Sequence, residues 1–445
     1  MLFRLLKTLE YCKLPVRFRL PWVRVQRNRP VPAPGLPRGF GTFRALRHRH
    51  YRILWIGMLA SALGTWMQIV AQSLLVLRLS GNSALALGTV SLAQASAFFL
   101  FAPLGGTFAD RHDKRRLLFC TQPLLMLSAF TLAGLTATGA VRLWMVVVIA
   151  FTSGALLSFD QPARAALLPL LAPQEDLMNS ISLQTLIFNA ASIAGPPLGG
   201  AVAAVAGLAG DFALNGCSYG AVMISLVLLP RELTALPASS GARTRTWAAV
   251  REMLEVIRKK PAVSAAVLVY AVLLFVAPSQ ALLVPLFVAK VLHGGAERLG
   301  FLFAASGIGT VLGALLVASI GGHRKKEPLL VSANAMWVIA LAIFALSRSF
   351  APAFAMLLAM AAAQSVFSTL VITLMQGSVE AKMRGRIMSV NTLLIMGLRP
   401  LGDFPVSVAA SFFGIAYAAL LSASVVALAG VLVFGFRYAK AKSFW

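Results

Sequence analysis

Residues 105 to 116 read Gly-Gly-Thr-Phe-Ala-Asp-Arg-His-Asp-Lys-Arg-Arg and place a dense cluster of mixed charge between two long apolar runs. Gly105 and Gly106 allow close backbone approach at the end of a helix. Apolar sequence resumes at Leu117. Because the runs on both sides are long enough to cross a bilayer, we expect a short charged loop between two membrane-spanning helices.

The composition of the whole chain is that of a membrane protein. Of its 445 residues, 59% are hydrophobic and 12% are charged, and the mean hydropathy is +0.81. A soluble domain would need many more polar residues to cover its surface. The length accommodates about a dozen spans of roughly 20 residues each with short connections.

Apolar runs recur along the chain with short breaks, and their lengths suit tilted membrane helices. The runs are 53–77, 85–108, 117–138, 143–160, 180–206 and 212–229, then 262–289, 299–320, 329–347, 351–375, 387–411 and 413–436. Their length and the absence of two-residue alternation exclude membrane strands. We therefore predict an all-α polytopic membrane protein with twelve transmembrane helices in two related six-helix bundles.

The breaks between these runs divide the chain into five parts. Residues 1–51 are rich in Arg and Pro and contain no apolar run long enough to span, so we expect a cytoplasmic extension rather than a signal peptide. Residues 52–229 and 262–436 hold the two bundles. The cytoplasmic linker 230–261 has apolar residues at helical spacing, which predicts an interfacial amphipathic helix. Residues 437–445 form a cytoplasmic tail.

The formal net charge of +26 follows the predicted topology. Of the 40 Lys and Arg residues, 34 fall before the first span, in alternate loops after it, or after the last span. The positive-inside rule therefore places both termini and the 105–116 loop on the cytoplasmic side of a bacterial-type inner membrane. Attraction to anionic lipid is sufficient to explain this charge, so no nucleic-acid partner is expected.

The sequence shows no reactive or metal-binding constellation. Cys12, Cys120 and Cys217 lie far apart and suggest no disulfide framework. The five histidines are scattered and lack the spacing of metal ligands. We therefore expect neither an enzyme nor a bound metal or cofactor.

The 105–116 loop resembles the signature loop of the major facilitator superfamily, Gly-x-x-x-Asp-Arg-x-Gly-Arg-Arg. In those transporters this loop joins the second and third helices on the cytoplasmic side. The matching residues are Gly106, Asp110, Arg111, Lys114 and Arg115. Asp113 stands where the superfamily usually has glycine.

Further stretches resemble the secretion-effector branch of the superfamily, which includes bacterial enterobactin exporters. Asp-Gln-Pro-Ala-Arg stands at 160–164, Gly-Pro-Pro at 195–197 and Arg-Gly-Arg-Ile-Met-Ser at 384–389. The resemblance covers nearly everything except the N-terminal extension. It implies the major facilitator fold, in which two six-helix bundles rock against each other and expose a midplane site to each side in turn.

The resemblance also implies a cytoplasmic gate, made of the matched loop residues together with Asp160 and Arg164. Asp110 would face the N-terminus of the eleventh span, where the helix dipole favours a carboxylate. Asp160 would pair with the basic cluster of the loop. The alternative is topological: charges stop helices from sliding through the bilayer, and an exposed salt bridge is worth only about 0–1 kcal/mol.

Gly195, Pro196 and Pro197 lie inside an apolar run. Small residues let membrane helices touch and proline kinks them, so we expect a bent, closely packed helix. The resemblance adds a second interpretation, the helix-bending region of exporters, although uptake branches can bend here as well.

Arg399 and Asp403 stand four residues apart, on one face of the eleventh predicted span. Each charge alone costs on the order of 3 kcal/mol at the centre of a membrane helix, so neither is expected to face lipid. Mutual neutralisation is the structural interpretation. Proton coupling through Asp403 is the functional one.

Four glutamines within predicted spans are candidates for a substrate cavity. They are Gln68, Gln72, Gln280 and Gln364. In superfamily members the corresponding spans line the central cavity. Buried amides also hold membrane helices together, so both roles stay open.

The function predicted is secondary active export of a small organic molecule, either siderophore-like, drug-like or a metabolite, by alternating access. The resemblance implies proton antiport, and no P-loop for direct ATP use is present. An uptake permease of the same fold is the alternative, followed by a non-transporting scaffold or receptor. The expected partners are the small-molecule substrate, a proton and the lipid bilayer, and the protein is expected to be monomeric.

Overall fold

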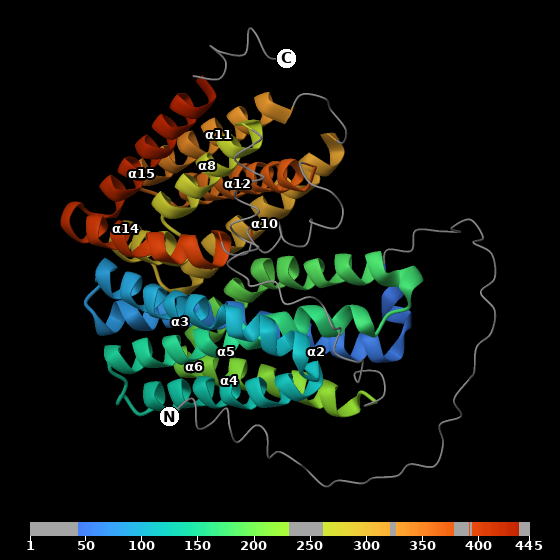
Figure 1. Cartoon of the computed structure of the whole chain (residues 1–445). Coiled ribbons are helices and arrows are strands. Elements are labelled where there is room, and N and C mark those ends of the chain that lie inside the picture. The colour runs from blue at the N-terminus through green and yellow to red at the C-terminus, as the bar shows by residue number, and fades with distance from the viewer. Residues whose placement is uncertain (1–42, 231–260, 321–325, 378–390, 392–393, 436–445) are drawn as a thin grey trace, which may run out of the picture. The chain divides into compact units, whose positions relative to one another are not determined.

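The computed structural model describes residues 43–230, 261–320, 326–377, 391 and 394–435, and every regular element in them is a helix. The first half of the chain forms η2 (Arg44–Arg47), α2 (Arg49–Leu79), α3 (Ala84–Arg111), α4 (Lys114–Ala137), α5 (Leu143–Leu170), η3 (Gln174–Asp176) and α6 (Leu177–Leu228) (Figure 1). The second half forms α8 (Pro261–Val276), α9 (Gln280–Lys290), α10 (Ala296–Ile320), α11 (Lys326–Leu346), α12 (Phe350–Gly377), η6 (Leu394–Leu398), α14 (Arg399–Phe413), α15 (Ile415–Gly430) and η7 (Val431–Gly435). The predicted all-α membrane fold is confirmed. The predicted amphipathic helix of 230–261, the 384–389 motif and residues 1–42 lie outside the described residues.

Helix α6 is too long to be a single span. Its 52 residues would measure roughly 78 Å at 1.5 Å per residue, against about 30 Å for a bilayer core. The helical path breaks at Gly207, where φ is 69° and ψ is 179°. Glycine adopts such positive φ values without steric penalty. We therefore treat α6 as two spans joined at Gly207.

Nine helices of the described part are long and apolar enough to cross a membrane, or ten if α8 and α9, bent by 40° to each other, form one broken span. Counting α6 twice and adding the shorter apolar helix Leu401–Phe413 would give the expected twelve. The count of twelve stays a prediction.

Small residues allow the helices within the first half to approach closely. A Cβ added at Gly64 would lie 2.5 Å from Ser218 Oγ, so α2 and α6 touch with almost no intervening side chain. A Cβ added at Gly105 or Gly154 would meet the backbone oxygens of Ser158 and Gln94, which brings α3 against α5. In lipid, such packing is a principal source of helix association.

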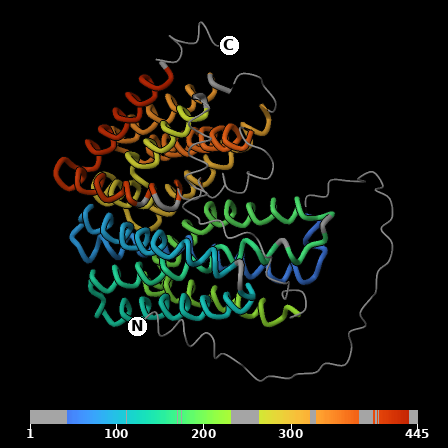
Figure 2. The backbone as a smooth tube through the Cα atoms, viewed as in Figure 1, coloured from blue at the N-terminus to red at the C-terminus, as the bar shows by residue number. Residues whose placement is uncertain are grey.

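The most extensive contacts between the two halves of the chain are made by two helix pairs, α6 with α10 and α3 with α14. Figure 2 shows the second pair side by side, although its members lie about three hundred residues apart in the sequence. We call the membrane side that carries the α3–α4 turn at His112–Asp113 the basic side, and the opposite side the far side.

Contacts between α6 and α10 toward the far side are made largely by backbone atoms. A Cβ added at Gly300 would lie 2.6 Å from the Pro196 carbonyl oxygen, and one added at Gly307 would lie 2.9 Å from that of Ser192. Helix α10 starts at Ala296 on the far side, so this contact reaches about 17 Å along the helix. The far-side seal therefore extends to about the middle of the membrane.

Candidate functional site

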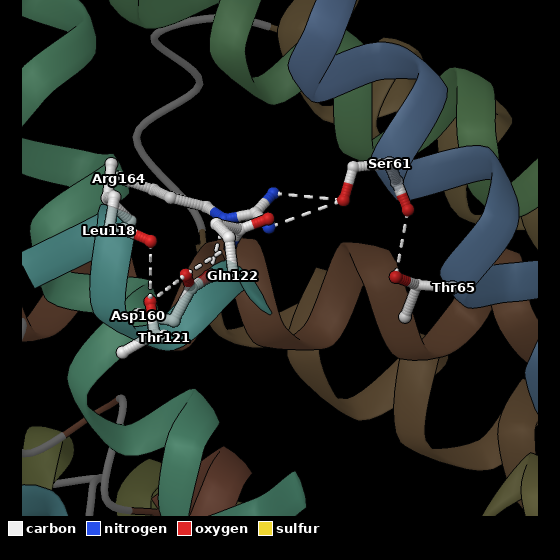
Figure 3. Close-up of polar contacts among 7 residues, drawn as sticks. All are labelled: Ser61, Thr65, Leu118, Thr121, Gln122, Asp160 and Arg164. Carbon is white, nitrogen blue, oxygen red and sulfur yellow. Dashed lines mark hydrogen bonds and ion pairs between the residues drawn. The ribbon is translucent and has the colours of Figure 1, made fainter. Parts of the chain in front are cut away.

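A buried ion pair joins Asp160 and Arg164, which stand one turn apart on α5 (Figure 3). The Asp160 side chain is 1% exposed and that of Arg164 is 18% exposed. Thr121 of α4 donates to Asp160 Oδ1 at 2.9 Å, and Gln122 Nε2 donates to the same oxygen. A buried carboxylate with a counter-ion and two donors has its charge compensated.

The same ion pair connects α5 to α2. Both terminal nitrogens of Arg164 donate to Ser61 Oγ at 3.3 Å, and Thr65 Oγ1 donates to the Ser61 carbonyl at 2.9 Å (Figure 3). We expected Asp160 to pair with the basic residues of the 105–116 loop. In the described part of the chain, its ion partner is Arg164 of its own helix, because a spacing of four residues brings the two side chains onto one helical face. The pairing with the loop stays a prediction.

The described residues of the 105–116 loop bind the start of α4 and the end of α6. Asp113 caps α4 by accepting from the Arg115 backbone N–H at 2.9 Å. The Arg115 guanidinium donates to the Leu229 carbonyl at 2.6 Å, at the C-terminus of α6, where the helix dipole favours a cation. Lys114 is half-buried at the first position of α4. A Cβ added at Gly106 would meet nothing within 4 Å.

The side chains of Asp110 and Arg111 lie outside the described residues. The expected contact between Asp110 and the eleventh span therefore stays a prediction.

The start of α2 is bound to the start of α6 on the basic side. Arg44 Nε lies 2.9 Å and His48 Nε2 lies 2.8 Å from the carboxylate of Asp176, which is buried. The Ala45 backbone N–H donates to Asn179 Oδ1 at 2.8 Å. Residues 44–48 fall within the predicted 1–51 extension, so the end of that stretch is anchored to the helical core.

A small cavity of about 60 Å³ lies between the two halves, at the end of the far-side seal. Its walls come from α2, α6, α9 and α10, and combine aromatic rings with uncharged polar groups. The lining residues are Trp66, Phe188, Asn189, Ser192, Gln280, Phe303, Ser306, Gly307 and Thr310.

Of the four candidate glutamines, Gln280 lines this cavity. Gln68 turns toward α6 and accepts from Asn215 Nδ2 at 2.5 Å. It also donates to Gln72 of its own helix at 3.5 Å. Gln364 is half-buried on α12 and is not part of the cavity wall. Sequence reasoning did not select Ser306 and Thr310, whose four-residue spacing on α10 was the signal for a polar face.

The Gly-Pro-Pro stretch packs between α2 and the second half. A Cβ added at Gly195 would lie 2.6 Å from Trp66 Cβ, and one at Gly199 would lie 2.9 Å from Met67 Cα. The helix continues through Pro196 and Pro197, and its non-helical residue is Gly207. Close packing at this stretch is thus present, while its role as a bending region stays a prediction.

Asp403 binds the break between α8 and α9. Its side chain is 2% exposed, and Oδ1 accepts from the Ser279 backbone N–H at 2.7 Å, at the N-terminal cap of α9. Gly402 lies against the Phe275 carbonyl at the end of α8. Among the described residues, no ion pair within 4.0 Å joins Asp403 to Arg399, although the two charges interact electrostatically. Mutual neutralisation of the pair and proton coupling through Asp403 both stay predictions.

A polytopic helical fold whose halves enclose a small cavity near mid-membrane, with aromatic and polar groups in its wall, is typical of alternating-access membrane transporters. The chain matches the transmembrane secretion effector family over residues 40–444 and belongs to this branch of the major facilitator superfamily. The family predicted from the sequence motifs is confirmed.

Relatives of the chain are bacterial transporters. An uncharacterized major-facilitator-type transporter of Bacillus subtilis is 26% identical over 60% of this chain, which spans 62% of that relative, less than two thirds of its length. Macrolide efflux protein A of Streptococcus pyogenes is 22% identical over 78% of this chain and 85% of its own. The enterobactin exporter of Citrobacter koseri is 23% identical over 66% of this chain and 69% of its own.

The fold is shared with a solved bacterial homologue of the human lysosomal transporter Spinster. The TM-score is 0.70 at 15% identity, and the match covers 89% of this chain and 97% of that one. At this identity the likeness concerns the fold.

Proposed function

We propose that the protein exports a bulky organic molecule, of the macrolide or siderophore kind, across the cytoplasmic membrane by alternating access. The relatives that carry the names macrolide efflux protein and enterobactin exporter support this class of substrate. We further propose that the basic side is cytoplasmic, that both termini lie there, that the transporter works as a monomer, and that proton entry drives export.

The observation that carries this proposal is the position of the cavity. The backbone contacts between α6 and α10 run from the far side to Gly307, and the cavity begins at that point with Ser306, Gly307 and Thr310. The two halves are therefore closed toward the far side. We expect them to separate on the basic side. A substrate would enter this state from the cytoplasm.

The cavity wall indicates what kind of substrate could bind. Trp66, Phe188 and Phe303 offer ring faces, and Asn189 and Gln280 are among the uncharged polar groups. A wall of this kind suits a molecule with both apolar surface and hydroxyl or carbonyl groups. A volume of about 60 Å³ has room for only about two waters, so an organic substrate binds only when the halves move apart.

Efflux from whole cells tests the proposal. Cells that express the protein should accumulate less radiolabelled macrolide and less iron-free catecholate siderophore than cells without it. Asp110→Asn should insert normally yet abolish the difference, because the helix-terminus contact implied by the family resemblance needs the charge. Equal accumulation with and without the wild-type protein for both compounds would contradict export.

The direction of transport separates export from uptake by the same fold. In inside-out membrane vesicles, an exporter loads the labelled macrolide into the lumen when the lumen is acidified. An uptake permease would instead load right-side-out vesicles.

A further inference from the structure

Asp211 differs from the other buried aspartates in the described part of the chain. These are Asp160, Asp176 and Asp403, and each has the counter-ion or backbone donor given above. Asp211 is 0% exposed, yet neither of its carboxyl oxygens has a hydrogen-bond partner. An unpaired buried carboxylate is among the most unfavourable groups in a membrane protein, so this carboxyl needs a proton.

The surroundings of Asp211 contain amides. Asn215, one turn further along α6, donates to Gln68 of α2 at 2.5 Å. The two helices run antiparallel, so one turn toward the far side on each of them brings Asp211 level with Gln72. Asp211 therefore continues a ladder of uncharged polar groups between α2 and α6.

No described charge compensates Asp211. The helices packed against α6 are α2, α4, α5 and α10. The ionisable groups at their far-side ends are Arg78, Arg142, Glu297 and Arg298. All four are exposed, and none of them forms an ion pair with Asp211 within 4.0 Å among the described contacts. α4 contributes no ionisable group at that end.

The polar groups near Asp211 lead toward the basic side. Tyr219, two turns along α6, interacts with the side chains of Asn215 and Thr65. Thr65 donates to the carbonyl of Ser61, whose hydroxyl accepts from Arg164. In the other direction, Asp211 lies only four residues after Gly207, where α6 turns at the far side.

We propose that Asp211 is the proton-carrying carboxyl of the transport cycle. It takes a proton from water when the far side opens, and it is neutral in the sealed state seen here. When the N-terminal half rearranges, Asp211 returns the proton to water that enters between the helices from the basic side. Its role in the cycle rests on the proposed proton antiport.

Carbodiimide labelling tests the protonation directly and without a substrate. N,N′-dicyclohexylcarbodiimide adds to protonated carboxyl groups in apolar surroundings and leaves a stable acylurea, which peptide mass spectrometry locates. In the full-length protein in nanodiscs, Asp211 should be labelled, and labelling should fall as pH rises. Asp160, buried to the same extent but paired with Arg164, is the matched control and should stay unlabelled. An unlabelled Asp211 would overturn the proposal.

Transport measurements distinguish a proton carrier from a carboxyl group that is protonated but only structural. Asp211→Asn keeps the size and the neutral state of the side chain, so it should exchange labelled macrolide across vesicles at the wild-type rate while losing the response to a pH gradient at least tenfold. Asp211→Glu should restore that response. An unchanged response in Asp211→Asn would refute the carrier role while leaving export intact. If the wild type moves no macrolide, the proposed function fails on this compound and labelling alone decides whether the site holds a proton.

Discussion

Removing the guanidinium of Arg164 should destabilise the N-terminal half far more than removing the carboxylate of Asp160. In Arg164→Ala, Asp160 keeps its donors from α4 but loses its counter-ion at 1% exposure. Breaking such a buried pair costs about 3–5 kcal/mol. In Asp160→Asn, the guanidinium is 18% exposed and still bonded to Ser61, so the expected loss is about 1–3 kcal/mol.

The double variant Asp160→Asn/Arg164→Gln removes both charges and should recover about 0.5–3 kcal/mol relative to the sum of the single changes. The measurement is thermal unfolding of the detergent-purified proteins, followed by tryptophan fluorescence and repeated at two protein concentrations. Arg116→Ala is the control, since its ion pair with Asp113 is long, at 3.8 Å, and Arg116 is 85% exposed. Two outcomes would refute this reasoning. One is a melting temperature of Arg164→Ala equal to that of the wild type, and the other is a double variant that is less stable than Arg164→Ala.

Three further changes test other parts of the structure. Gly300→Leu places a side chain against the Pro196 carbonyl and should block far-side closure, so that in a Ser306→Cys background a membrane-impermeant thiol reagent labels the cavity from outside; labelling equal to that of Ser306→Cys alone would contradict the seal. Deleting residues 2–40 should leave insertion and transport nearly intact, whereas deleting 2–48 removes two ion partners of Asp176 and should lower the melting temperature; equal melting of both truncations would argue against the anchor. Asp403→Ala leaves the Ser279 backbone N–H without its acceptor and should cost about 1–3 kcal/mol, which unfolding measures; a stable variant would show that this hydrogen bond is dispensable.

The helices were predictable because membrane spans are long and apolar, and this signal does not depend on tertiary contacts. The break at Gly207 lies in the gap that the sequence left between two spans. The expected spans 180–206 and 212–229 end and begin on either side of it, so Asp211 fell in an assumed loop. A hydropathy pattern treats a carboxyl group as a sign of solvent, and it cannot recognise one that folding has buried.

The partners of the charged residues needed the structure. Asp160 and Arg164 were both selected from their motif, and their spacing allows a pair on one helix, but the family resemblance implied that Asp160 pairs with the basic loop. Arg399 and Asp403 have the same spacing, yet Asp403 binds the Ser279 backbone of another helix. Spacing along a helix shows which side chains can reach each other. The groups at the ends of neighbouring helices decide which contacts form.

The far-side seal between α6 and α10 consists of glycines set against carbonyl oxygens, with Gly300 on Pro196 and Gly307 on Ser192. Where a glycine lies on a carbonyl oxygen, few side-chain rotamers have to rearrange when the joint opens. Variation in the rings and amides of the cavity wall therefore leaves the joint unchanged, and selection can retune what the cavity accepts without rebuilding the barrier. Only a mutation that adds bulk at these glycines changes both the barrier and what the cavity accepts.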